Sequence, residues 1–174
     1  GSPVYETGAV TISTTAGFNT GFLLNTPHTQ LVIAQVNLPA SNIALTGHGT
    51  GNADNFYGMT TVESGNLYNY PNGAKVVPVP LMVVPTTGFY MVGAKYGGTG
   101  TKPGIFWHDG AALNLWEPSS ALTPTVTPTN NMRVGSGYGT AGATAKVAAS
   151  VFFNRVLSVA ELREVHDYLK LLLA

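Results

Sequence analysis

Between residues 10 and 153 the chain alternates short stretches of β-branched and aromatic residues with clusters of Gly, Pro, Asn and Thr. This alternation is typical of an antiparallel all-β domain, in which a turn follows each short strand. The stretches that meet the pattern lie at residues 10–13, 30–37, 43–46, 56–62, 67–70, 75–84, 88–96, 104–108, 112–116, 132–135 and 145–153. So many short strands predict an antiparallel β-sandwich, in the form of a jelly roll.

Turn and strand-breaking residues refine this prediction. Asp109-Gly110 lies between two apolar stretches and predicts a two-residue hairpin turn, because both residues tolerate positive φ. Pro78, Pro80 and Pro85 place the 75–84 stretch at a sheet edge or in a connection, since proline cannot donate to the strand ladder.

The last twenty residues have a different pattern, rich in charge and helical in period. Ser158 and Glu161 form a capping box, with Leu157 and Leu162 as the accompanying hydrophobic staple, so a helix is expected to begin at Val159. An apolar face follows at steps of three or four residues. Its members are Leu162, Val165, Leu169 and Leu172, while Arg163 and Asp167 are spaced to form an ion pair.

Composition limits the classes of function. At 174 residues, with 44% apolar residues, the chain has the size of one folded domain. Only 9% of residues are charged and the formal net charge is zero, which disfavours nucleic acid and anionic membranes as partners. The absence of cysteine excludes disulfides, thiolate metal sites and a cysteine nucleophile. No apolar run approaches the roughly 20 residues of a membrane span.

Residues 3–174 are expected to form this single domain. Gly1 and Ser2 resemble a remnant of cloning, and no initiator Met follows them. We therefore expect that the domain was excised from a longer protein.

Catalytic patterns are weak. The acids of the β portion are far apart in sequence, whereas jelly-roll glycosidases bring two carboxylates together across the scissile bond. These acids are Glu6, Asp54, Glu63, Asp109 and Glu117. The histidines His28, His48, His108 and His166 have no nucleophile-elbow context, with His28 expected in a loop and His166 at the surface or boundary of the helix. A lyase built from Gln35, His48, Tyr57 and Arg133 has no supporting spacing. The sequence therefore predicts a protein that is not an enzyme.

The loop from His48 to Asn55 is the most polar of the chain. Asp54, Asn52 and backbone carbonyls there are oxygen ligands of the kind that calcium prefers, although one carboxylate supplies little charge. The alternative is a simple turn. No other cofactor is indicated.

Aromatic side chains near loops and strand ends suit a neutral ligand, because planar rings stack on the apolar face of a sugar while Asn and Thr bind its hydroxyls. Three loops are favoured as the binding rim, at residues 48–57, 96–102 and 136–140. The proposed stacking residues are Tyr57, Tyr96, Trp116 and Tyr138, with Asn52 and Asn55 as hydrogen-bonding residues. The alternative for Trp107 and Trp116 is a packed cross-strand pair in their hairpin.

The segment from Val147 to Ser158, followed by Ala160-Glu161-Leu162, resembles the end of concanavalin A-like and laminin-G-like jelly-roll domains. Those domains close with a last strand, an Asn-Arg-x-Leu-Ser corner and an acid-containing helix. The similarity continues through residues 29–38, 89–94, 106–110 and 132–135, in order, and covers residues 18–170. It implies a jelly roll with one C-terminal helix. The family's last strand often carries an Asp-Glu pair where this chain has Ala148-Ala149, so no role for those acids is carried over.

Members of this superfamily include lectins, carbohydrate-binding modules, glycosidases and receptor-binding parts of phage tail proteins. The charge-poor texture looks most like phage tail fibre or tailspike domains. The resemblance implies a non-catalytic module that binds a bacterial surface glycan, extracellular or on a virion tail, within a homotrimer. A structural or trimerisation module without a ligand and a polysaccharide-degrading enzyme remain the alternatives.

Overall fold

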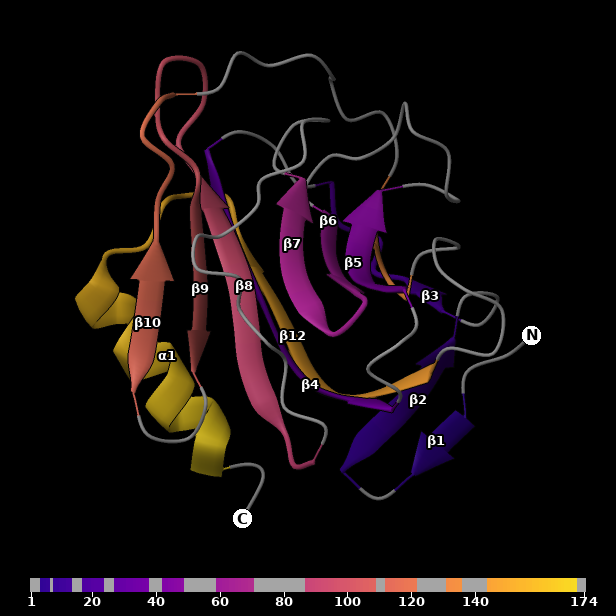
Figure 1. Ribbon diagram of the computed structural model, residues 1–174. Coiled ribbons are helices and arrows are strands. Elements are labelled where there is room, and N and C mark those ends of the chain that lie inside the picture. The colour runs from indigo at the N-terminus through magenta and orange to yellow at the C-terminus, as the bar shows by residue number, and fades with distance from the viewer. Residues whose placement is uncertain are drawn as a thin grey trace.

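The computed structural model describes residues 4–6, 8–13, 17–23, 27–37, 42–48, 59–70, 87–108, 112–121, 131–135 and 144–171. These residues form two antiparallel sheets packed face to face, with one helix outside (Figure 1). The predicted all-β sandwich with a C-terminal helix is confirmed. Within the described residues, no helix is long and apolar enough to cross a membrane.

The larger sheet has seven strands, and its central strands are the longest. Its order is β1 (Val4–Glu6), β2 (Ala9–Ser13), β12 (Thr144–Phe153), β4 (His28–Asn37), β8 (Tyr90–Tyr96), β9 (Gly104–His108) and β10 (Leu113–Trp116). The smaller sheet has five strands, in the order β3 (Phe18–Asn19), β11 (Met132–Val134), β5 (Ile43–His48), β6 (Met59–Glu63) and β7 (Asn66–Tyr70).

Most predicted strands are confirmed within the described residues. The predicted 75–84 strand lies outside them, as does the Asp109-Gly110 turn. The strands on either side of that turn do pair as a hairpin, but His108 is opposite Leu113, so four residues rather than two separate the paired positions. The sequence pattern missed β1 and β3, which are only three and two residues long.

The space between the sheets is filled mainly by Val and Ile, whose branched side chains pack well on a pleated surface. We call this cluster the inner core: Ile12, Val32, Ala34, Val36, Ile43, Leu45, Val62, Leu67, Tyr90, Val92, Ile105, Val134, Ala145 and Val147. Burial of the Tyr90 hydroxyl in this core raises its pKa well above the usual range.

Helix α1 (Val159–Leu171) covers part of the opposite face of the seven-stranded sheet (Figure 1). The cluster beneath it, the helix-side core, consists of Leu31, Ile33, Met91, Phe106, Leu157, Leu162 and Leu169. Gly93 makes this close packing feasible, because a Cβ there would lie 2.5 Å from the Phe106 ring.

The start of α1 has the predicted capping box. Glu161 Oε2 accepts hydrogen bonds from the backbone N–H of Ser158 at 2.8 Å and from its hydroxyl at 2.9 Å, and the Glu161 N–H donates to Ser158 Oγ at 3.3 Å. Arg155 adds an ion pair to Glu161 at 2.6 Å. The preceding corner is tied to β4, since Thr29 Oγ1 accepts from the N–H of Leu157 and donates to the carbonyl of Arg155, both at 2.9 Å.

Candidate functional site

The strand directions bring two of the predicted stacking residues to one end of the sandwich. Tyr96 ends β8 opposite His28, the first residue of β4, and Trp116 ends β10 opposite Ile105. We call this the loop end. The third predicted loop, residues 136–140, is flanked by Val134 and Thr144, and Thr144 pairs with Asn37 at the other end of β4. Residues 49–57 and 136–140 of the other two predicted loops lie outside the described residues.

Tyr96 is not a surface platform, and this prediction needs correction. Its side chain is only 1% exposed, and its ring meets the His28 ring edge-on, with centroids 6.0 Å apart. The reason is the alternation of β8, in which Tyr90 and Val92 face the inner core and Tyr96 follows in the same phase. His28 is likewise a buried strand residue rather than a loop residue.

Buried polar side chains replace the aliphatic ones at the loop end. His28 and Gln30 on β4 follow the same face as Val32, and Thr46 is opposite the inner-core residue Val134. Asn69 follows Leu67 on β7 in the same way. Each of these four polar residues has an interaction partner. A layer of buried polar side chains therefore lies beneath the loop end.

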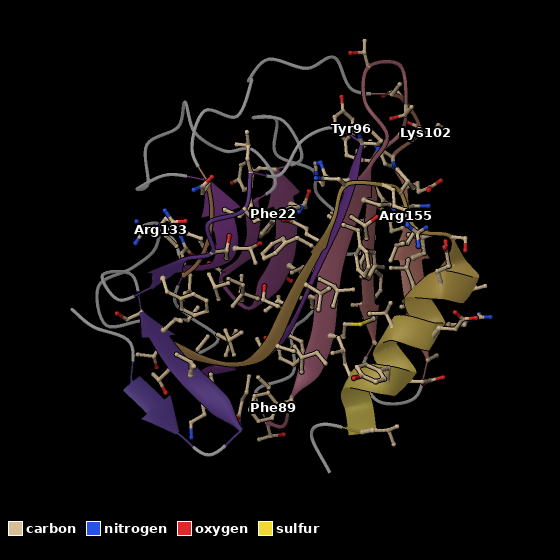
Figure 2. The ribbon with its side chains drawn as sticks, turned by 180° about the vertical axis from the view of Figure 1, so that it is seen from behind. Phe22, Phe89, Tyr96, Lys102, Arg133 and Arg155 are labelled. Atoms are coloured by element: carbon tan, nitrogen blue, oxygen red, sulfur yellow. The ribbon has the colours of Figure 1, made fainter. Side chains whose placement is uncertain are left out.

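The 96–102 loop is held by its own hydrogen bonds. The backbone N–H and the hydroxyl of Thr101 both donate to the carbonyl of Gly98, at 3.0 and 2.6 Å. Lys102, at the end of this loop, is exposed and lies near the top of the molecule in Figure 2. These two hydrogen bonds fix the conformation of the turn from Gly98 to Thr101 at this end of the sandwich.

The two tryptophans of the chain share one face of β9 and β10. Asn114 is paired with Trp107, and Trp116 lies two residues further along β10, so all three side chains point to the same side. Both rings are partly buried against the inner core. In Figure 1, β9 and β10 extend to the left of β7, the last strand of the smaller sheet. We call Trp107, Asn114 and Trp116 the tryptophan face.

Local contacts fix the geometry of this face. Asn114 Nδ2 donates to the carbonyl of Ala112 at 3.2 Å, which orients the amide. Glu117, directly after Trp116, forms an ion pair with Lys95 at 3.0 Å across β9. This ion pair lies on the other face of the sheet, because the Lys95 side chain borders Gly104 together with Leu115, which is opposite Phe106 of the helix-side core.

The acids and histidines form no catalytic arrangement among the described residues. Glu63 accepts a hydrogen bond from the Tyr70 hydroxyl at 2.9 Å, and Glu117 is paired with Lys95. No group of three metal-ligating side chains occurs in the described part of the chain. Gln35 and Arg133, which the lyase hypothesis required, lie on different sheets.

Two imidazole rings that the sequence pattern did not predict to meet are stacked in the structure. His108 on β9 and His166 on α1 have ring centroids 3.5 Å apart and planes at 14°. Asp167 Oδ1 lies 3.1 Å from His166 Nδ1 in place of the predicted pair with Arg163. His166 is 7% exposed, so it is buried rather than at the surface. No local signal indicates this contact, because 58 residues separate the two rings.

The remaining predicted site residues lie outside the described residues. These are Tyr57, Tyr138, Asn52, Asn55 and the calcium candidate Asp54. Among the four proposed stacking residues, Tyr57 and Tyr138 are thus not described and Tyr96 is buried. Trp116 is described and partly exposed.

No family model and no curated protein match the sequence. Among solved structures, the chain is similar to a mutant of the protein called HCR/D, with a TM-score of 0.58 and 8% identity over 92% of this chain and 42% of that one. It is similar to the binding domain of Botulinum Neurotoxin DC in complex with SialylT, with a TM-score of 0.54, 6% identity and coverage of 92% and 39%.

A third similar structure is the cellulose induced protein Cip1, with a TM-score of 0.52 and 12% identity over 86% of this chain and 80% of that one. The chain spans less than half the length of the first two structures. At these identities the similarities establish the fold, and the class of protein is a β-sandwich domain with one C-terminal helix.

Proposed function

We propose that this domain is a non-catalytic carbohydrate-binding module and that the tryptophan face is its binding surface. The observation that carries this proposal is the placement of Trp107, Asn114 and Trp116 on one side of two adjacent strands. Indole rings stack on the apolar face of a sugar, and an amide beside them, here that of Asn114 opposite Trp107, binds a hydroxyl.

The charge of the molecule supports a neutral ligand. The formal net charge is zero, and only 9% of the residues are charged. A glycan bound through stacking and neutral hydrogen bonds requires no charged partner. The Botulinum Neurotoxin DC binding domain in complex with SialylT offers a ligand-binding example of a similar fold.

The biological setting that we propose is a phage tail fibre, a tailspike or a secreted bacterial adhesion protein. The ligand would then be a glycan of the bacterial surface, and the site of action extracellular or on a virion tail. Binding by one shallow site is weak, and several copies in a homotrimer would strengthen it through avidity. Tyr57, Tyr138, Asn52 and Asn55 remain proposed as additional contacts from the loops, and Asp54 as a calcium ligand.

A screen of the purified domain on immobilised bacterial surface polysaccharides tests the function, with and without calcium and with cleavage products monitored. We expect saturable binding without cleavage. Absence of binding to every glycan would favour the structural or trimerisation module, and release of oligosaccharides would favour the enzyme.

Substitution tests the surface on any glycan that binds. Trp116→Ala should weaken binding by about tenfold or more, since buried aromatic anchors dominate such interfaces. Asn114→Ala, which leaves both core-packed rings in place, should weaken it less. The matched control is Tyr168→Ala, because Tyr168 is an aromatic residue of α1 that is 67% exposed. Unchanged binding by folded Trp116→Ala and Asn114→Ala proteins would show that the glycan binds elsewhere.

A further inference from the structure

The edge of the sandwich opposite the tryptophan face contains an open groove. It lies between β2 and β12 of the larger sheet and β3 and β11 of the smaller one, with a cavity volume of about 420 Å³. Figure 2 shows Phe22 on this side of the molecule, beside β12. The volume is within the range typical of small-molecule sites.

A β-bulge shapes the wall of this groove. The pairing of β12 with β4 shifts between Val147 and Ala149, so one extra residue is inserted there. Val147 packs in the inner core before the bulge, and Phe152 packs against the same core after it, five residues later. The bulge has therefore changed the phase of the strand. It places Ser150, which is opposite Val32 of the inner core, in the same phase as Phe152, while Ala148 and Ala149 pack against the helix-side core.

The groove is apolar and aromatic. Phe22 and Phe152 are stacked, with ring centroids 6.1 Å apart and planes at 25°, and Phe18 adds a third ring. None of the residues that line it is charged. An uncharged ligand with a planar ring fits these surroundings, since aromatic rings pack favourably in offset stacks.

Two hydroxyl groups line the groove, and only one of them has partners. Thr20 Oγ1 donates to the carbonyl of Met132 at 2.8 Å and accepts from the N–H of Phe22 at 3.2 Å. Ser150 Oγ is buried and has no hydrogen-bond partner. An unpartnered buried hydroxyl is costly and rare in a folded protein, so it marks a position where a ligand atom would be stabilised.

We propose that this groove is a second binding site, for a small uncharged aromatic molecule with one hydroxyl or carbonyl group. The ring lies among Phe18, Phe22 and Phe152, and the polar group bonds to Ser150. This site does not depend on the tryptophan face, because the two lie at opposite edges of the seven-stranded sheet.

The test is an NMR titration of the full 174-residue chain, labelled with ¹⁵N. Benzyl alcohol and toluene are added in separate titrations as matched probes. We expect both to shift amide signals of the groove strands at millimolar concentrations. The ratio of the two affinities isolates the hydrogen bond, because the probes differ by the hydroxymethyl and methyl groups. Ser150→Ala should lower the benzyl alcohol to toluene affinity ratio by about fivefold to tenfold.

A second variant tests the position of the site. Val10→Phe enlarges a partly buried side chain that lines the groove, and it should weaken both probes by about tenfold. Val156→Phe is the matched control, because Val156 is 39% exposed and is not among the lining residues. The proposal is overturned if neither probe shifts groove signals, or if Val10→Phe and Val156→Phe bind the probes equally well. An unchanged affinity ratio in Ser150→Ala would overturn the role of Ser150.

Discussion

The two cores on either side of the seven-stranded sheet differ in composition and in the elements that form them. The inner core is rich in Val and Ile and joins strands from both sheets. The helix-side core consists of four Leu residues with one Ile, one Met and one Phe, and it joins α1 and its preceding corner to β4, β8 and β9. Branched side chains pack well between two pleated sheets. Longer and more flexible side chains fill the irregular space between a helix and a sheet.

The difference in connectivity has a consequence for stability. The inner core depends on strands from the whole chain, so its loss should unfold the molecule. The helix-side core depends on one C-terminal element that packs on an already formed sheet. The contacts of this core can be lost by local opening of α1 while the sheet stays folded, because separately packed regions of a protein open independently. Three changes test this comparison.

The largest effect is expected at Gly93 on β8, which is opposite Phe106 of the helix-side core. A Cβ at this position would overlap the backbone carbonyl oxygen of Gln30 on β4 and lie 2.5 Å from the Phe106 ring. Backbone cannot move aside as a flexible side chain can. Gly93→Ala should therefore lower the free energy of unfolding by at least about 3 kcal/mol, measured by urea denaturation.

Gly97→Ala is the matched control for this change. The three atoms nearest to a Cβ there, at 3.1 to 3.4 Å, all belong to the side chain of Thr101, and none is backbone. We expect a loss below about 1 kcal/mol. Equal losses in the two variants would mean that the close approach of β8 to β4 and Phe106 is not a constraint on the fold.

A pair of leucine truncations separates the two cores directly. Leu67 in the inner core and Leu162 in the helix-side core are both fully buried. Each Leu→Ala change should cost about 2–5 kcal/mol. Leu171→Ala, on the same helix but 74% exposed, should cost less than about 0.5 kcal/mol.

Hydrogen exchange should then distinguish the two losses. Leu67→Ala should accelerate exchange in both sheets, because it lowers the global stability. Leu162→Ala should accelerate exchange in α1 by more than in β4 and β8. If α1 and the sheet lose protection together in Leu162→Ala, the two cores form one cooperative unit.

The start of α1, which depends on neighbours in sequence, was predicted correctly, whereas site features that depend on strand register were not. The capping box links residues three apart, so the start of α1 was evident from the sequence. Tyr96 was misplaced although a local signal existed, because Val92 and Ala94 continue the same apolar phase towards it. The shared face of Trp107 and Trp116 requires the hairpin register, which the sequence left open.

The groove and the imidazole stack had no local signal at all. The bulge after Val147 comes from how β12 pairs with β4, more than a hundred residues earlier in the chain. The contact of His108 with His166 depends on where α1 packs against the sheet. Such contacts follow from the fold as a whole and not from spacing along the chain.

The smallest effect is expected at the start of α1, where the helix-side core meets solvent. The hydrogen bond from the backbone of Ser158, together with the hydrogen bond and charge of Arg155, lowers the pKa of Glu161 from its ordinary 4.5 to about 2. Because the pKa is lower in the folded state, the ionised carboxylate contributes stability that is complete above about pH 4.5. That contribution is lost as the pH falls from about 4.5 to about 2.

Glu161→Gln isolates this contribution, because it keeps a side chain that can cap the helix but does not titrate. Other carboxyl groups also titrate in this range, so the relevant quantity is the difference in thermal unfolding midpoint between the two proteins. We expect the original protein to be the more stable at pH 6 and the difference to shrink as the pH falls towards 2. A difference that stays constant with pH would show that the charge of Glu161 does not stabilise α1, and that the helix is held by its apolar face alone.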